Sequence, residues 1–536
     1  MSLMSALARM EAATAGRAVP AATVRHRRLS ERPLVFVPLT TAGEAGAPLG
    51  ALVGPDREAP QLLVVPQPRD RDLRFAFLAR LADTVLPHLE SAQDDVEWEE
   101  RKETDPETGK KVPVQVELCV DAPQLLVPNA PGLDFVRLLG RSMRFRRTAE
   151  EEPEAAYPAP PRVPLLGRWL THYGERARVP GASLLLSMTE LLTRHWATGQ
   201  SALEDQHLGA LLAWIAPPDG LTGAEAALRA EVERDGAGRL LLPPAGPATD
   251  PAFDNHHLAP AVARFDAGVP GAEDEVRELI ASQLRPTWEA MWRGVDLLRT
   301  LPEGARVAER WKRDRWSYTG HRDRVRTGEP PQPRRDDAVT AAAKLAGREQ
   351  AQARLAAQEA LDDPLVMAAR RLTGEAFTGE VVEVEMAYSD GKRPMPRPLV
   401  TVRTDDRPAL AEGGKVHRVV GGDARQSAEF VARTDAHLVT VRLVNGMGRG
   451  KAPAPGTVPE KGDRLCWTLF EHAPRGGPGL PGVEDTPWTH GGPPAEFSAS
   501  ADASAPTGPD GPAASAEPPA VPPRPLPDPV TSEDLL

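Results

Sequence analysis

The spacing of apolar residues along this chain changes at Gly374, and this change predicts two regions of different secondary structure. Before Gly374, apolar residues recur three and four positions apart over long stretches, which is typical of amphipathic helices. After Gly374 they alternate with polar residues in short runs between turn sequences such as SDGK and EGGK, which is typical of strands. The predicted strands are 378–386, 399–404, 415–420, 428–432, 438–444 and 463–471.

Five or six short strands in one segment predict a small antiparallel β-barrel of the OB or SH3-like kind over residues 374–474. A β-sandwich is the alternative, because the spacing of strands does not fix whether a sheet closes. The segment contains few aromatic residues, and most of them, Phe377 and Trp467 among them, are expected to fill the interior.

The N-terminal region predicts an α/β domain over residues 31–147, preceded by an N-terminal arm at 1–30. Three apolar runs, LVFVPL, LGALVG and QLLVVP, are separated by glycine, proline and charged residues, as expected for strands of a partly buried sheet. An amphipathic helix should follow at 70–90, then a hairpin around the turn sequence DPETGKK. A second helix at 133–145 ends in a basic cluster of Arg137, Arg141, Arg144, Arg146 and Arg147.

Helical periodicity dominates the middle of the chain. It predicts a helical domain over 163–301, then a basic connector and helical spacer over 302–373. The last segment, 475–536, is rich in proline and acidic residues and too poor in large apolar side chains to offset the entropy of ordering, so we expect a disordered tail. The expected fold class is therefore α+β and multidomain.

The composition of the chain bears on its charge, its location in the cell and its source. Of the formal net charge of −12, residues 476–536 contribute most, since they hold nine carboxylates and one arginine, and the rest of the chain carries −4. Two distant cysteines exclude a disulfide framework, and no apolar segment predicts a leader or a membrane span, so we expect a cytoplasmic protein that does not contact a membrane. Scarce lysine and asparagine beside abundant alanine, proline and glycine are typical of a GC-rich bacterial genome.

The strongest functional signal is the segment 306–335, which sets ten basic side chains and three large aromatic ones beside four carboxylates. Arginines can neutralise phosphates and aromatic rings can stack on bases, so the segment predicts contact with DNA or RNA. The candidate residues are Arg306, Arg310, Trp311, Lys312, Arg313, Arg315, Trp316, Tyr318, Arg322, Arg324 and Arg326.

An ordinary structural interpretation of the same segment is also open. If the segment is helical, 100° per residue places Val307, Trp311 and Tyr318 on one stripe that should face protein. The arginines would then form a solvated face, with Glu309 and Asp314 in helix-surface ion pairs. The nucleic-acid hypothesis depends on guanidinium groups that point outward, unpaired, on a common surface.

The barrel adds two candidate residues for nucleic-acid contact. Small barrels often bind single strands across one face, with loops between strands as clamps, and the loop GMGRGK carries Arg449 and Lys451. This loop resembles a phosphate loop only superficially, because it runs into prolines and does not open a helix.

The chain contains no catalytic, metal-binding or cofactor motif, and we assign no catalytic residue, metal ligand or cofactor from the sequence. One alternative is a divergent metal-dependent nuclease or other hydrolase in the N-terminal α/β domain. Its acidic hairpin carries Asp94, Asp95, Glu97, Glu99, Glu100 and Lys102, but Glu100 and Lys102 share a strand with Asp95, which is the wrong order for one metal. The histidines show no metal-binding spacing.

The sequence favours a cytoplasmic, non-enzymatic accessory or adaptor protein that contacts nucleic acid, or a nucleoprotein partner, through the basic segment and the barrel. A protein partner could bind the tail, where PPRPLP at 522–527 could form a polyproline II ligand and SEDLL at 532–536 an acidic, apolar end. Besides the hydrolase, the other alternative is a structural subunit of a larger assembly.

Overall fold

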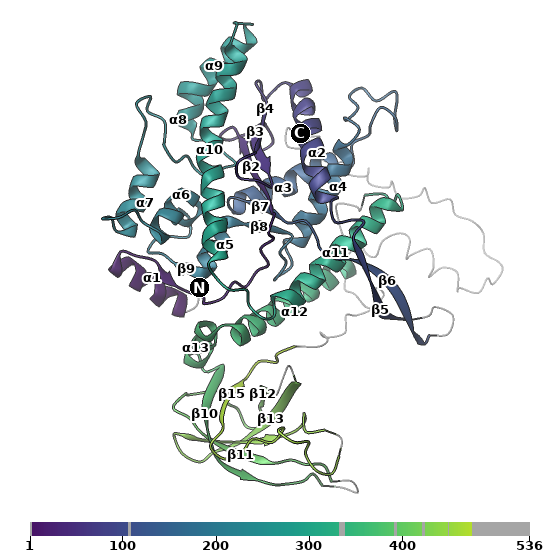
Figure 1. Ribbon diagram of the computed structural model, residues 1–536, viewed down its shortest axis with the longest axis vertical. Helices are drawn as coiled ribbons and strands as arrows, with labels where there is room; N and C mark the ends of the chain where they lie inside the picture. The colour runs from purple at the N-terminus through teal and green to yellow at the C-terminus, as the bar shows by residue number, and fades with distance from the viewer. Residues whose placement is uncertain are drawn as a thin grey trace, which may run out of the picture.

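The computed structural model describes residues 3–104, 109–331, 338–390, 394–420, 424–448 and 450–473. The fold is mixed α and β, with a larger body built around one main sheet and a closed β-barrel at one end of the molecule (Figure 1). Helices α12 (Ala338–Asp362) and α13 (Pro364–Leu372) lead from the body to the barrel. The predicted tail lies outside the described residues.

Among the described residues, the main sheet has five strands in the order β4-β3-β2-β7-β8. The first three strands form the antiparallel meander expected from the three apolar runs, whereas β7 and β8 join in parallel. β8 comes from the region expected to be helical, so one sheet takes strands from both predicted domains. The strands are β2 (Leu34–Thr40), β3 (Pro48–Gly54), β4 (Gln61–Val64), β7 (Leu125–Val127) and β8 (Leu185–Ser187).

Both faces of this sheet are covered, which explains why its strands are apolar without alternation. Every residue of β2 is buried, and successive side chains enter different cores: Leu34 and Phe36 join one, Val35 and Val37 the other. Figure 1 shows the long helix α10 running beside the sheet. The first core is closed by α2 (Arg71–Leu89), α3 (Ala130–Met143), α4 (Val163–Arg176) and α11 (Val307–Arg326), and the second by α5 (Met188–His195), α6 (Leu208–Ile215) and α10 (Ala272–Arg299).

The remaining elements of the body are smaller. The predicted hairpin is present as a separate two-stranded sheet that projects from the body (Figure 1). It consists of β5 (Val96–Thr104) and β6 (Lys111–Cys119). The others are α1 (Leu3–Ala15), β1 (Val19–Pro20), β9 (Trp196–Ala197), η1 (Glu204–Gln206), α7 (Gly223–Val232), α8 (Pro251–Phe253), η2 (Asp254–Leu258) and α9 (Ala259–Asp266).

The predicted barrel is confirmed. Its six strands close in the order β10-β11-β14-β13-β12-β15 within the described residues, so the sandwich alternative is wrong. Alternate side chains fill the interior, and Phe377 and Trp467 are fully buried there. The strands are β10 (Ala376–Glu385), β11 (Leu399–Arg403), β12 (Lys415–Val420), β13 (Ala424–Arg433), β14 (Leu438–Leu443) and β15 (Arg464–Thr468).

The helical spacer before the barrel is less exposed than its composition indicates. Leu355 and Gln358 of α12 are buried. Between α12 and α13, the carboxylate of Asp363 caps α13 by accepting from the Leu365 amide at 2.9 Å. It also accepts from the amide and the hydroxyl of Thr23, at 2.7 and 3.0 Å. The N-terminal arm is therefore fixed to the start of the barrel connection.

Replacing the buried Asp363 with alanine should lower the free energy of unfolding by about 2 kcal/mol, because it removes a helix cap and the acceptor of the Thr23 amide and hydroxyl. Asp363→Asn, which keeps one acceptor oxygen, should lose less. Chemical denaturation followed by circular dichroism measures both. Asp250→Ala, which removes a cap from the single-turn helix α8, is the matched control, with an expected loss of about 1 kcal/mol. Equal losses at Asp363 and Asp250 would contradict the proposed tie to the arm.

Candidate functional site

The aromatic residues of the basic segment take the structural positions that the helical wheel predicts. Val307, Trp311 and Tyr318 lie on the buried side of α11, and the two rings belong to the first core. The Trp311 indole donates to Asp121 at 2.8 Å, and the Tyr318 hydroxyl donates to the Leu89 carbonyl at 2.7 Å. The ring of Trp316 is partly exposed, but the guanidinium of Arg101 lies over it, 4.7 Å from its centroid. These rings therefore offer little free surface to a base.

Most of the cations in this segment are engaged inside the protein, so the expectation of unpaired, outward guanidinium groups is wrong. Arg310 is 4% exposed and donates to Gln358 and to the His26 carbonyl, at 2.8 and 3.0 Å. Arg322 is 2% exposed and donates to the Glu117 carboxylate at 2.9 Å. The physical reason is that acidic and polar groups from distant parts of the chain surround α11.

Five further cations of this segment pair with carboxylates. The partners come from three places: the hairpin, the start of α11 itself and the end of α12. Lys312 pairs with Glu99 and Arg315 with Glu97, while Arg306 meets Asp362 at 2.7 Å, Arg313 meets Glu309 at 2.5 Å, and Arg326 meets Asp94 at 2.6 Å.

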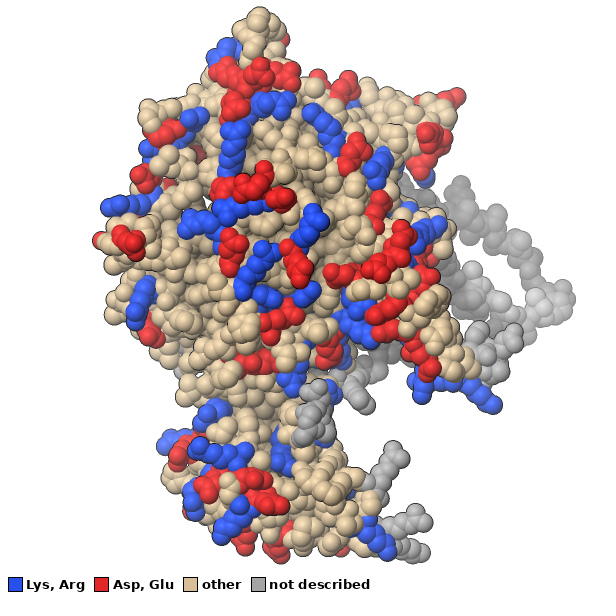
Figure 2. Space-filling view, viewed as in Figure 1, with Lys and Arg blue, Asp and Glu red and all other residues tan. Residues whose placement is uncertain are grey.

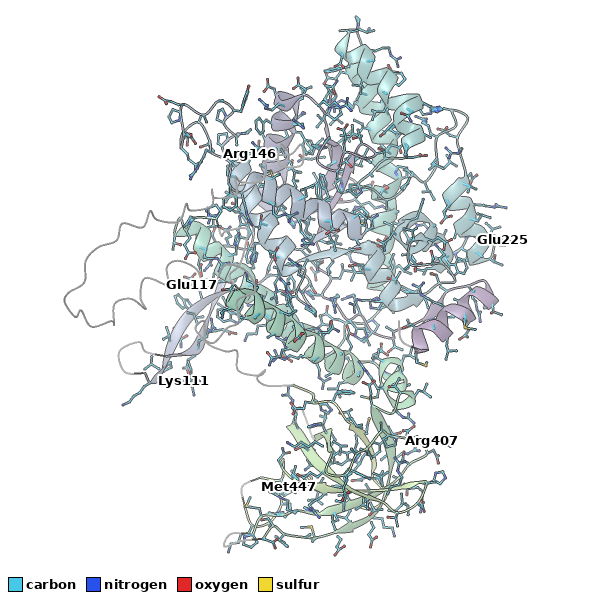
Figure 3. All side chains as sticks on the ribbon, turned by 180° about the vertical axis from the view of Figure 1, so that it is seen from behind. Lys111, Glu117, Arg146, Glu225, Arg407 and Met447 are labelled. Atoms are coloured by element: carbon cyan, nitrogen blue, oxygen red, sulfur yellow. The ribbon has the colours of Figure 1, made fainter. Side chains whose placement is uncertain are left out.

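These ion pairs also explain the acidic hairpin that the nuclease alternative depended on. Glu97, Glu99 and Glu117 of the hairpin pair with cations of α11. Figure 3 labels Glu117 near the base of the hairpin and Lys111 toward its free end. Glu100 and Lys102 are exposed on the two-stranded ribbon, outside the main sheet. Within the part of the chain that the structure describes, no group of three or more His, Cys, Asp or Glu side chains could hold a metal ion.

Arg324 is different, because it lines a groove of about 890 Å³ between α3, α4, α11 and α12. Nine basic side chains of the described residues line this groove, against one carboxylate, Glu175. Figure 2, by contrast, shows blue and red side chains interspersed over the face turned to the viewer. The nine are Arg137, Arg141, Arg144, Arg168, Arg176, Arg178, Arg324, Lys344 and Arg348, and we call this site the cationic groove.

Two glycines bring the arginine-bearing helices together. A Cβ atom on Gly140 of α3 would lie 2.6 Å from the Thr171 amide nitrogen, and one on Gly167 of α4 would lie 2.5 Å from the Arg144 amide nitrogen. Only glycine permits an approach this close. The basic end of α3 and the arginines of α4 therefore line one surface, although the sequence predicted that they belong to two different domains.

The positive charge of the groove is only partly compensated. Arg176 pairs with Asp314 at 2.7 Å, and Arg178 and Arg348 share Glu175 at 3.6 Å each. Arg168 donates to the Glu329 carbonyl at 2.7 Å, which satisfies a donor without neutralising its charge.

Three guanidinium groups carry the uncompensated charge. Among the described residues, no carboxylate lies within 4.0 Å of the guanidinium groups of Arg141, Arg168 or Arg324. Cations concentrated in a concave surface with few counter-charges attract anions.

A pair of histidines lies at the wall of the groove. The rings of His172 and His321 stack with their centroids 4.2 Å apart. Burial, with the charges of Arg324 and Arg176, lowers the pKa of His172 to about 3. Burial and the neighbouring His172 and Arg324 also hold the pKa of His321 far below its ordinary value. Both rings are therefore neutral at physiological pH, and the arginines and Lys344 supply the charge of the groove.

The barrel loop GMGRGK, which carries the candidate residues Arg449 and Lys451, is only partly described by the structure. Lys451 is described and exposed, whereas Arg449 lies outside the described residues. Gly446 and Gly448 have φ of +76° and +89°, so this loop makes the left-handed turns that glycine favours. Nucleic-acid contact by Lys451 and Arg449 stays a prediction.

The cationic groove was not predicted from the sequence as a site, although the sequence shows the arginine stripes of two of its helices. The basic end of α3 was noticed, and Arg137, Arg141 and Arg144 lie on one stripe at positions i, i+4 and i+7. Arg168, His172 and Arg176 repeat every four residues on α4 in the same way. Reading these stripes together requires knowing that α3 and α4 are neighbours.

Comparison with known proteins found no matching family model, no matching curated protein and no matching solved structure. In the described part of the chain, none of the helices combines the length and the apolar character needed to cross a bilayer.

The buried histidines predict that the protein loses stability as the pH falls from 7 to 5. Burial lowers the pKa of His195, which is fully buried, from 6.5 to about 4, and His321 is shifted in the same direction. In the unfolded chain these histidines bind a proton near pH 6.5, whereas in the folded protein they stay neutral. Below pH 6.5, each such histidine should therefore lower the free energy of unfolding by up to about 1.4 kcal/mol per pH unit. Urea unfolding at several pH values measures this, and His321→Phe should flatten the dependence. An unchanged slope in that variant would contradict the assignment.

Proposed function

We propose that the protein is a non-enzymatic adaptor that binds single-stranded nucleic acid in the cationic groove. The observation that carries the proposal is the presence of nine basic side chains and one carboxylate around a single concave surface. Phosphate neutralisation by arginine and lysine supplies most of the affinity of proteins for nucleic acid. The basic segment then has mainly a structural role, with Arg324 as its contribution to the groove.

The extent of the groove supports a polymer over a small phosphorylated molecule. Its cations come from four helices, and the three guanidinium groups without a carboxylate partner, those of Arg141, Arg168 and Arg324, lie on α3, α4 and α11. A single phosphate group carries at most two negative charges and would not neutralise all three. A nucleic-acid strand presents one phosphate per nucleotide and can satisfy several cations in turn.

The form of the groove supports a single strand over a duplex. Duplex readers place a helix or a β-ribbon in a groove of the DNA, whereas here the cations lie inside a concavity of the protein. Phe145, which directly follows Arg144, is 50% exposed, but the Arg144 guanidinium lies over one face of its ring, 4.6 Å from the centroid, so only the other face is left for a base to stack on.

We propose that the barrel makes a second contact with the nucleic acid. A pocket of about 230 Å³ on its surface is lined by two cations, Lys415 and Arg425, and one carboxylate, Glu471, together with polar side chains that include His417, Gln426 and Asn445. α12 runs from the cationic groove, where it contributes Lys344 and Arg348, toward the barrel (Figure 1). A strand leaving the groove along α12 would reach this pocket.

Fluorescence anisotropy with a labelled oligothymidine of 20 nucleotides tests the proposal. The protein should bind it more tightly than a duplex of the same length, with an affinity that falls steeply with salt. Arg141→Gln combined with Arg324→Gln should weaken binding about tenfold or more at 0.1 M salt, because two phosphate contacts are lost. The salt slope should fall by about 1.4.

The matched control is Arg277→Gln with Arg285→Gln, which removes the same charge from a partly exposed and an exposed position on α10. It should leave binding unchanged. Equal weakening by both pairs would mean that only the overall charge matters, and no binding at low salt would refute the proposal. Cleavage of the strand in Mg²⁺ or Mn²⁺ that disappears in Glu100→Ala would instead establish the nuclease alternative.

A further inference from the structure

A second cavity lies on α3, beside the cationic groove but with a different lining. It has a volume of about 720 Å³, within the range of small-molecule sites. Its lining is mostly apolar, from Phe135 and Leu138 of α3 and from prolines and glycines of the segment 244–248. A lining of this kind suits a small organic molecule better than a polyanion.

The position of the cavity in the fold is one where α/β proteins commonly bind ligands. It opens at Thr40, the last residue of β2, and beside the start of α3, which follows the parallel strand β7. Ligands of open α/β sheets bind in the crevice outside the carboxyl ends of the parallel strands.

The walls of the cavity are fixed by hydrogen bonds of the backbone. The Thr40 amide donates to the Pro247 carbonyl at 2.7 Å, and the Thr249 amide donates to the Thr40 carbonyl at 3.0 Å. The side chain of Asn129, the N-cap of α3, donates to the Gly246 carbonyl at 2.9 Å. The segment 244–248 is thus attached to both the sheet and the helix, so the cavity is preformed.

The cavity is elongated along α3. Pro131, Asp134, Leu138 and Arg141 line it, and ten residues of helix span about 15 Å. Its end near the sheet carries the hydroxyls of Thr40 and Thr41, which are buried and have no hydrogen-bond partner among the described residues. Thr40 is fully buried, and a buried hydroxyl without a partner is unfavourable. The far end carries the exposed guanidinium of Arg141.

We propose that this cavity binds a small, elongated organic anion with an apolar body. Its carboxylate or sulfonate group would bind Arg141, its apolar body would contact Phe135 and Leu138, and a polar group at its other end would bind the hydroxyls of Thr40 and Thr41. The inference does not depend on the proposed nucleic-acid binding, although Arg141 lies at the edge of both sites.

A pair of fluorescent probes tests this proposal on the full-length protein. 8-Anilinonaphthalene-1-sulfonate has an aromatic body and one sulfonate, and N-phenyl-1-naphthylamine has a similar body without charge. The anionic probe should bind with a stoichiometry of one. Arg141→Gln should weaken the anionic probe about tenfold and leave the neutral probe nearly unchanged, because it removes a charge-assisted hydrogen bond and no apolar surface.

Variants that fill the cavity separate this site from other apolar surfaces. Ala248→Trp and Ala45→Trp add an indole at exposed positions of the lining, so the fold should be retained, and each should abolish the binding of both probes. Ala308→Trp, at an exposed position of α11 outside the cavity, should change neither. Binding of several probe molecules, undiminished binding in both filled variants, or equal loss of the two probes in Arg141→Gln would overturn the proposal.

Discussion

The burial of α11, a helix rich in arginine, determines where the elements around it lie. Asp314 lies at its centre, fully buried, and accepts from Arg176 of α4 and from the Ser183 amide, both at 2.7 Å. A helix this basic can be enclosed only if neighbouring elements supply carboxylates and carbonyls. The acidic hairpin supplies them on one side and the end of α12 on the other, so charge neutralisation positions both elements.

The same constraint creates the cationic groove. Arg306 and Arg310 near the start of α11 bond to Asp362 and Gln358 near the end of α12, so the two helices are antiparallel. The start of α12 then lies beside the end of α11, and Lys344 and Arg348 face the arginines of α3 and α4. The carboxylates of the hairpin, the start of α11 and the end of α12 pair with other cations. The groove beside the end of α11 and the start of α12 therefore has few carboxylates and stays positively charged.

Local patterns in the sequence predicted the elements whose formation depends on near neighbours. The meander β2 to β4, the hairpin and the barrel were found because alternation and turn residues are read within short windows. β8 was missed because three residues are too few to show a period. The ion pairs of α11 could not be found, since Arg315 and Glu97 are 218 positions apart and nothing local links them. The cationic groove was missed for the same reason, because it requires the packing of four helices.

We propose that nucleic acid binds where α3, α4 and α12 meet and not on the outward face of α11 and the hairpin. Hydrogen–deuterium exchange of the full-length protein, with and without a saturating single-stranded oligonucleotide, tests this directly. Binding in the groove should protect residues 137–147, 168–178 and 341–350 from exchange and leave the hairpin at 96–119 unchanged. Protection confined to the hairpin and the barrel, with none at the groove, would contradict it.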